Sequence, residues 1–251
     1  MRGASILQRY LLIIFFLLIT TFISSIPTKA IIRSREEYEK TSHVIWEIKT
    51  DKKIIAITFD DGPHPVYTPL ILDILAKYDA KATFFVTGKK ADEYPDVLKR
   101  IVKEGHEVAN HTYNHVRGNK MNSKKLITEL ETTAESIKRI TKIKPALFRP
   151  VGGFYNDLII NTAVNNNYLV VMWSWHQDPK DWNGTNTNKI TNHVISSARP
   201  GDIVLLHDSG GDRTKTIKAL ERILDFLTKN NYKCVTVSEM ILLSEELPQF
   251  P

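Results

Sequence analysis

The sequence predicts an α/β domain built on a parallel sheet, either open or closed into a barrel. Short apolar runs of β-type composition alternate with longer amphipathic segments, and each parallel crossover needs a connection of helix length. The chain has 251 residues, of which 42% are hydrophobic and 25% charged, enough for one domain with a full core. Seven strands are expected, at residues 54–59, 82–86, 106–110, 146–149, 168–174, 203–207 and 233–237.

The segments between these strands have the apolar periodicity and the boundary residues of helices. Ser123 is the expected N-cap of the longest one, and Pro145 follows its end. Gly105 is a helix stop before the third strand. Six helices are expected, at residues 68–78, 94–104, 123–140, 156–166, 187–198 and 213–229.

The N-terminus has the pattern of an export signal. Arg2 and Arg9 precede an apolar stretch over residues 10–26, and Thr28-Lys29-Ala30 offers a small-residue cleavage site. The stretch is short for a full membrane span, which needs about 20 residues, and a retained N-terminal anchor is the alternative. In both cases residues 1–30 are expected to place the rest of the chain outside the cytoplasm, secreted or at the cell surface.

Composition sets the remaining boundaries. Residues 31–52 are polar and mixed in charge and are expected to form a linker, the folded domain is expected over 53–242, and 243–251 are expected to form a C-terminal tail.

The lone Cys234 cannot form an internal disulfide and is expected to be a small buried hydrophobe. The net charge of +6 suits an anionic surface, but the lysines are scattered, so no nucleic-acid partner is expected. A monomer is the default.

Two adjacent carboxylates end the first expected strand. Asp60 and Asp61 follow the run 54–59 and precede Gly62-Pro63, which places both acids at the C-terminal end of a strand. Neighbouring side chains on a strand point in different directions. We therefore expect different tasks, one acid binding a metal and the other handling protons. A solvated turn is the alternative, because each of these residues is turn-prone.

Two histidines supply partners for a metal. His111 and His115 stand at i and i+4, which on one turn of helix lie on the same face. Two histidines and one carboxylate form a recurring set for catalytic Zn²⁺, and Asp61 is the natural third ligand. Asp60 can then serve as a base for a water whose pKa the metal lowers. A pair of exposed helix histidines is the alternative.

Two further strand ends carry polar side chains suited to the same site. His207 ends an apolar strand, and a protonated imidazole there could donate to a departing amine. Arg149 could hold the carboxylate of Asp60, and the turn at Gly152 and Gly153 frees backbone N–H groups for an oxyanion. The alternatives are a strand-end histidine bonded to backbone and a surface turn.

Aromatic residues gather between the fifth and sixth expected strands. Three of the four tryptophans lie within residues 173–182, beside carboxylates and an amide. Flat aromatic faces of this kind suit a sugar-binding cleft, and core packing is the alternative. His176 is expected to support the site or to contact substrate rather than to bind the metal.

The site residues lie in five short motifs along the chain. The motifs are Thr58-Phe59-Asp60-Asp61-Gly62-Pro63, His111-Thr112-Tyr113-Asn114-His115, Arg149-Pro150-Val151-Gly152-Gly153, Asp178-Pro179-Lys180-Asp181-Trp182 and Leu205-Leu206-His207. In this order they closely resemble the motifs of the polysaccharide deacetylases of carbohydrate esterase family 4, the NodB homology domain. The resemblance covers about residues 53 to 242, and chance occurrence of all five motifs in order is negligible.

The resemblance implies a distorted (β/α) barrel of about seven to eight parallel strands. It also implies removal of N-acetyl groups from amino sugars with a divalent metal, Zn²⁺ first and Co²⁺ as another candidate. By motif position it implies a catalytic base (Asp60), metal ligands (Asp61, His111 and His115), a general acid (His207), a pair that orients base and acid (Arg149 and Asp181) and walls for the acetyl methyl group (Leu205 and Trp182).

One position departs from the family pattern. The third motif commonly carries a bulky aromatic before its glycine, and here that position is Gly152. Its backbone N–H can still serve an oxyanion, but the side wall of the sugar groove is missing. The expected activity is N-deacetylation of N-acetylglucosamine in peptidoglycan or a chitin-like oligomer. An O-acetyl esterase acting on xylan or a related glycan and a non-catalytic wall-binding module are the alternatives.

Overall fold

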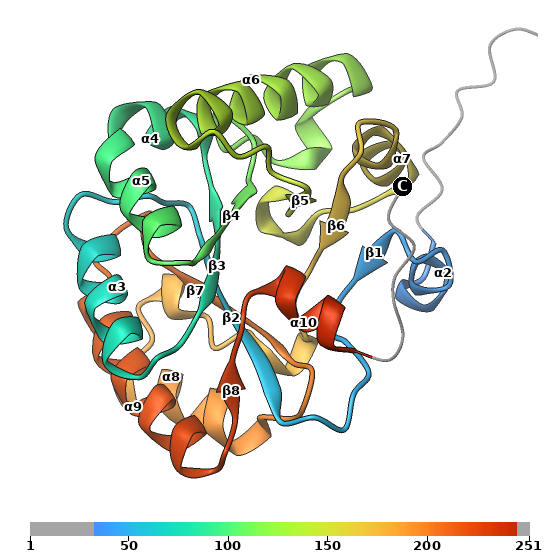
Figure 1. Ribbon diagram of the computed structural model, residues 1–251. Helices are drawn as coiled ribbons and strands as arrows, with labels where there is room; N and C mark the ends of the chain where they lie inside the picture. The colour runs from blue at the N-terminus through green and yellow to red at the C-terminus, as the bar shows by residue number, and fades with distance from the viewer. Residues whose placement is uncertain (1–32, 245–251) are drawn as a thin grey trace, which may run out of the picture. The chain divides into compact units, whose positions relative to one another are not determined.

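The computed structural model describes residues 33–244 (Figure 1). The predicted signal peptide or anchor, residues 1–30, lies outside the described residues, as does the predicted tail beyond Ser244. None of the helices described is both long and apolar enough to cross a bilayer.

A wholly parallel sheet forms the centre of the domain, as predicted. Its strand order is β1-β6-β5-β4-β3-β2-β7, and β8 pairs with the start of β2. The expected α/β fold with a distorted barrel is confirmed, and all seven predicted strands are present in whole or in part. The strands within the described residues are β1 (Val44–Ile45), β2 (Ile54–Asp60), β3 (Ala82–Val86), β4 (Glu107–Asn110), β5 (Leu147–Phe148), β6 (Leu169–Val171), β7 (Ile203–His207) and β8 (Lys233–Cys234).

The barrel is distorted because its two edge strands, β1 and β7, do not pair with each other. Only the residues next to them meet. An isolated antiparallel bridge joins Glu47 to Asp202, and the Ile48 N–H donates to the Gly201 carbonyl at 2.9 Å. The sheet therefore curls without closing its last seam.

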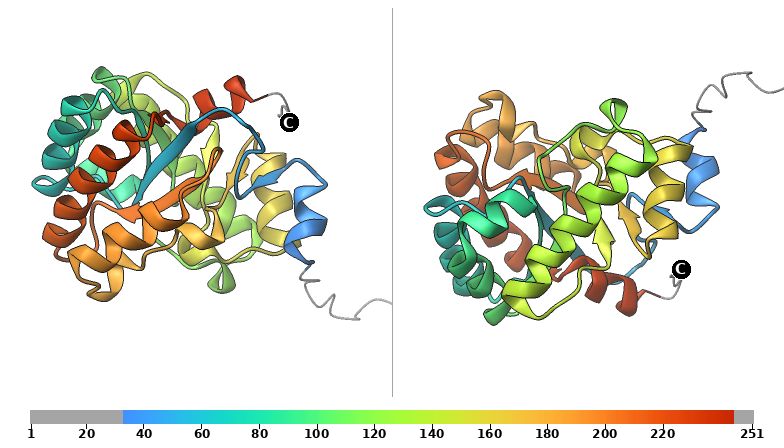
Figure 2. Two further views of the ribbon diagram at one scale, coloured as in Figure 1. Left: turned by 90° about the horizontal axis from the view of Figure 1, so that it is seen from below. Right: turned by 90° about the horizontal axis from the view of Figure 1, so that it is seen from above.

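Helices pack around the outside of the curled sheet (Figures 1 and 2). All six predicted helices are present. The N-cap of α6 is Asn122 rather than the predicted Ser123, because the Asn122 side chain accepts the Lys125 N–H. The helices of the described chain are α2 (Arg35–Glu39), α3 (Tyr67–Lys77), α4 (Gly88–Glu93), α5 (Pro95–Lys103), α6 (Ser123–Thr141), α7 (Asp157–Asn165), α8 (Thr187–Ser197), α9 (Thr214–Lys229) and α10 (Val237–Leu243).

Two segment predictions were wrong. Residues 31–52, expected as a linker, contain α2 and β1, and β1 pairs with β6 while Trp46 is fully buried. The predicted last strand, 233–237, stops at Cys234 because Thr236 caps α10 by accepting the Glu239 N–H. Cys234 is a buried free thiol, as expected, and burial raises its pKa to about 12.

The strands bury both faces, as parallel strands between helices do. Along β2, Ile55, Ile57 and Phe59 face outward and pack with α3 and α9. Ile54 and Ala56 face inward and share a cluster with α10 residues such as Met240. Because side chains alternate, the inward row of β2 continues through Thr58 to Asp60. The strand thus delivers one carboxylate to the C-terminal mouth of the barrel.

Candidate active site

A cavity of about 340 Å³ lies at the C-terminal ends of the strands. Active sites of α/β barrels are built at this end. Arg149 and Asp181 do not line the cavity but are buried behind Asp60 and His207, which do. The other predicted site residues that line it are Asp61, His111, His115, Gly152, Trp182 and Leu205.

Asp60 is held by a buried cation. It is 4% exposed, and its Oδ1 accepts a hydrogen bond from Arg149 Nη1 at 2.7 Å. The guanidinium of Arg149 is fixed in turn, because Nε and Nη2 donate to the Val171 and Met172 carbonyls and its Cζ lies 3.9 Å from the centroid of the Phe85 ring. Burial lowers the pKa of Arg149, and Asp60 opposes that shift. A guanidinium stays charged even so, and Asp60 therefore has a permanent counter-ion.

Asp61 points in a different direction from Asp60 and meets the histidines. Its backbone is left-handed, with φ 76°. Its Oδ1 lies 2.9 Å from His115 Nε2 and 3.5 Å from His111 Nε2. Burial would raise the pKa of Asp61, but the two imidazoles hold it well below its usual range. The predicted difference in direction between the two acids is present.

The histidine pair lies on a loop rather than on the helical turn that its i,i+4 spacing suggested. Residues 111–115 follow β4 without helical structure, and both Thr112 and His115 have positive φ. Glu129 of α6 holds the loop by accepting the backbone N–H groups of Tyr113 and Asn114 at 2.8 and 2.7 Å. A loop held by Glu129 of α6 therefore brings the two histidines together, in place of a turn of helix.

Asp61, His111 and His115 fit a divalent metal. One ligand atom from each lies within 4.8 Å of the others. His111 Nδ1 lies 2.8 Å from the Arg149 carbonyl oxygen, which can only accept, so Nδ1 carries a proton. In a neutral ring Nε2 is then a free lone pair facing Asp61. Two nitrogens and one carboxylate oxygen match the donor set of a catalytic zinc site.

Polar side chains near the backbone of Asp61 were missed at the sequence level. Lys90 Nζ donates to the Asp61 carbonyl at 2.9 Å and to Ser209 Oγ. Asp208 is fully buried and accepts from Thr68 Oγ1. Burial raises the pKa of Asp208 to about 7. Its place directly after His207 was the signal available in the sequence.

His207 faces the cavity as a cation. Its Nδ1 lies 2.7 Å from Asp181 Oδ1, and its backbone N–H donates to Asp181 Oδ2 at 3.0 Å. Thr216 Oγ1 also donates to Asp181, and Arg213 donates to the Asp181 carbonyl. Burial would lower the pKa of His207, but Asp181, with Asp60 and Asp61 more weakly, raises it to about 9. The imidazole therefore keeps its proton at neutral pH, with Nε2–H as the remaining donor.

The aromatic segment divides between the cavity and the surface. Trp173 and Trp182 line the cavity, and Trp182 is 52% exposed. Trp175 instead lies under the Arg35 guanidinium, 5.2 Å from its Cζ, and is 62% exposed. His176 is 3.0 Å from Asp202 and does not line the cavity. Within the described residues, no contact of His176 with the site supports the supporting or substrate-contact role expected for it.

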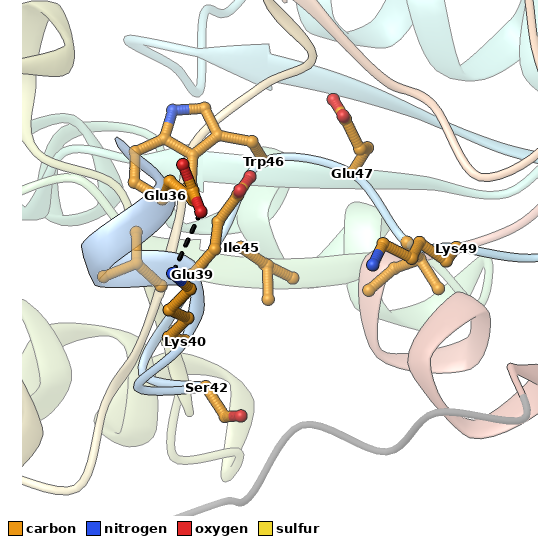
Figure 3. A pocket seen from close by; sticks show the side chains of 10 residues that line it. Glu36, Glu39, Lys40, Ser42, Ile45, Trp46, Glu47 and Lys49 are labelled. Carbon is orange, nitrogen blue, oxygen red and sulfur yellow. Dashed lines mark hydrogen bonds and ion pairs between the residues drawn. The ribbon is translucent and has the colours of Figure 1, made fainter. Parts of the chain in front are cut away.

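A larger cavity of about 470 Å³ beside α2 and β1 lacks this chemistry (Figure 3). Its charged side chains include Glu36 and Lys40, which pair at 2.9 Å. Among the described residues that line it there is no histidine and no aspartate. The smaller cavity is the candidate active site.

Known proteins share this sequence and this fold. Residues 47–171 match the family model described as polysaccharide deacetylase. A peptidoglycan-N-acetylglucosamine deacetylase of Bacillus cereus is 47% identical over 207 residues, which are 82% of this chain and 97% of that protein. The crystal structure of a peptidoglycan N-acetylglucosamine deacetylase bound to a naphthalenyl N-oxidanyl-benzamide has a TM-score of 0.79, with 33% identity, and the match covers 85% of this chain and 99% of that one. A CE4 family pseudoenzyme from Bacillus anthracis has a TM-score of 0.72 and 29% identity over 78% of this chain and 68% of its own.

Proposed function

The chain belongs to the polysaccharide deacetylases of carbohydrate esterase family 4, and from this membership we propose that it removes N-acetyl groups from N-acetylglucosamine residues of a glycan, either peptidoglycan or a chitin-like oligomer. One observation carries the proposal. A carboxylate with a buried counter-ion, Asp60, and a protonated imidazole, His207, line the same cavity as a three-residue metal set.

We propose that the reaction depends on a divalent metal, with Zn²⁺ as the first candidate and Co²⁺ as the second. Asp61, His111 and His115 would hold it. When bound, such an ion supplies Lewis acidity, which lowers the pKa of a water and polarises a carbonyl.

Two side chains then move the protons. Asp60 accepts a proton from the water that attacks the acetamide carbonyl, and the charge on Arg149 keeps Asp60 oriented through Oδ1. His207 donates the proton on Nε2 to the nitrogen as the C–N bond breaks. The hydroxyl of the water ends on the acyl carbon, so the products are acetate and a free amine on the sugar.

The cavity walls suit an acetamide. Leu205 and Trp182 offer apolar surface for the methyl group. Gly152 lines the cavity in a left-handed turn with φ 64°, and its N–H is the proposed donor to the developing oxyanion. A volume of about 340 Å³ lies within the range of sites that enclose one small ligand group.

Mass spectrometry of purified glycans tests the proposal. Metal-stripped protein, then protein with added Zn²⁺ or Co²⁺, would be incubated with peptidoglycan, chitin oligomers and O-acetylated xylan. We expect N-deacetylated sugars and acetate only with metal. Faster release from xylan would assign an O-acetyl esterase instead. Glycan binding without acetate release from any substrate would overturn the enzymatic proposal and assign a binding module.

A further inference from the structure

The position where the family's aromatic is missing lies against a cation. Gly152 has φ 64°, and a Cβ built on it would lie 3.5 Å from Arg117 Nε and 3.8 Å from Nη2. Any larger side chain at residue 152 would extend from that Cβ into the space around the guanidinium. Arg117 therefore occupies the side of the groove that an aromatic would otherwise form.

The guanidinium of Arg117 is free to bind a ligand. It is exposed and lines the cavity, and within the part of the chain that the structure describes it makes no hydrogen bond or ion pair. Arg213, which also lines the cavity, differs, because its Nε, Nη1 and Nη2 donate to the carbonyls of Ser209, Asp181 and Gly210. Arg213 is structural, whereas the five donors of Arg117 have no partner within residues 33–244.

The carboxylates of the cavity are already committed elsewhere. Asp60 pairs with Arg149, and Asp61 faces the two histidines. Asp178 accepts the Lys180 N–H and lies more than ion-pair distance from Arg117, since no such pair is present in the described chain. Arg117 thus adds a positive charge that no carboxylate in the described part of the chain neutralises. A planar guanidinium is best matched by a carboxylate, which it binds bidentately.

We propose that Arg117 is a specificity-determining residue that binds a carboxylate carried by the glycan beside the acetamido group to be hydrolysed. The inference rests on the proposed function. Because the guanidinium lies against Gly152, whose N–H serves the acetamide oxygen in that function, the carboxylate belongs to the reacting sugar or to its immediate neighbour. The substrate class is therefore an acidic glycan containing muramic acid, with the carboxylate on its lactyl ether or on the attached peptide. Chitin oligomers carry no carboxylate.

Steady-state kinetics with three substrates test this inference on the metal-loaded protein. They are chitotetraose, peptide-free wall glycan with lactyl carboxylates, and wall glycan with its peptides. The matched variants are Arg117→Gln and Lys120→Gln, which removes an exposed cation from the same loop outside the cavity. Arg117→Lys tests rescue by a point charge.

We expect Arg117→Gln to raise KM for an acidic glycan about five- to tenfold, between the contributions of an exposed ion pair and a charge-assisted hydrogen bond. The kcat on that glycan, and both constants on chitotetraose, should change by less than about twofold, and Arg117→Lys should recover part of KM. Lys120→Gln should match the wild type. An effect on peptide-free glycan assigns the lactyl carboxylate, and an effect on peptide-bearing glycan alone assigns the peptide.

Equal changes on neutral and acidic glycans, or none, would overturn the inference while acetate release still supported the deacetylase proposal. If the wild type releases acetate from no glycan, the proposed function fails separately. Calorimetric titration of the same three glycans then decides the inference, because equal Kd values for wild type and Arg117→Gln on acidic glycan would refute it.

Discussion

Each end of the barrel holds a carboxylate, buried Asp60 at one end and half-buried Glu107 at the other, and the two carboxylates have opposite surroundings. At the C-terminal end, Asp60 has a charged partner, Arg149, and an open cavity in front of it. At the other end, Glu107, the first residue of β4, accepts from Thr83 Oγ1 at 2.7 Å and from the Ser238 N–H at 3.2 Å, with Ser238 Oγ as a third donor. Ser238 belongs to α10, so Glu107 holds that helix against the barrel.

The difference shows that burial alone does not identify a catalytic acid. Every donor around Glu107 is a neutral hydroxyl or amide, and burial raises its pKa despite them. Asp60 Oδ1 accepts a hydrogen bond from the cation Arg149. Its other oxygen, Oδ2, lies 3.8 Å from His111 Nε2. A carboxylate suited to proton transfer needs a fixed partner on one oxygen and access to substrate on the other. A carboxylate with both oxygens occupied by the fold is structural.

The largest expected effect is the loss of activity on replacing Asp60. We expect Asp60→Asn to lower kcat/KM on the order of 10³-fold, because the amide cannot accept the proton. Metal content should remain near one ion per chain, since Asp60 is outside the ligand set. Acetate release and elemental analysis of the same preparation would measure both.

Asp61→Asn is the matched control, because it changes the neighbouring acid in the same way. Here metal content should fall together with activity. If Asp60→Asn lost the metal, or if Asp61→Asn kept both metal and activity, the assignment of separate tasks to the two acids would be wrong.

A smaller effect is expected from replacing Asp181, the partner of the proposed general acid His207. His207 must be protonated to donate, and its pKa near 9 predicts that kcat falls as the pH rises through about 9. Replacing Asp181 with Asn removes the charge that raises this pKa and leaves the burial that lowers it. The basic limb of the pH–kcat profile should therefore move to lower pH by at least about one unit. An unchanged basic limb in Asp181→Asn would exclude His207 as the group that this limb reports.

The sequence predicts the residues at the C-terminal end of the barrel better than it predicts the contacts that hold those residues in place. Asp60, Asp61 and His207 stand at the ends of strongly apolar strands, and a parallel sheet brings such ends together. The spacing of His111 and His115 suggested a helical turn, whereas the chain forms a loop there, because the residue that folds that loop, Glu129, lies on α6. No local pattern could disclose a contact made across the fold.

Short and exposed features were the other misses. Strand β1 has only Val44 and Ile45, too few residues for an alternating pattern, and it is fixed by pairing with β6. Arg117 is an ordinary exposed arginine in the sequence. Its significance depends on the position of its guanidinium relative to Gly152, which only the folded chain defines.

The smallest effect on activity is expected at the opposite end of the barrel. Glu107→Ala should lower the free energy of unfolding by about 2–3 kcal/mol, because it leaves the donors of buried Thr83 and half-buried Ser238 without their acceptor. It should change kcat/KM by less than about twofold, as measured by denaturant unfolding and acetate release on the same variant. A large loss of activity at unchanged stability would contradict the structural role given to this end.

The isosteric variant Glu107→Gln sharpens the same test through pH. An acid whose pKa is higher in the folded than in the unfolded state binds more protons when folded, so its contribution to stability decreases as the pH rises from about 4 through the folded pKa. Glutamine does not titrate and lacks this slope. The free energy of unfolding of Glu107→Gln relative to wild type should therefore increase between pH 4 and pH 8, while kcat/KM stays the same. A constant difference across that range would mean that Glu107 ionises as easily in the fold as in water, and its contrast with Asp60 would then rest on access to the cavity alone.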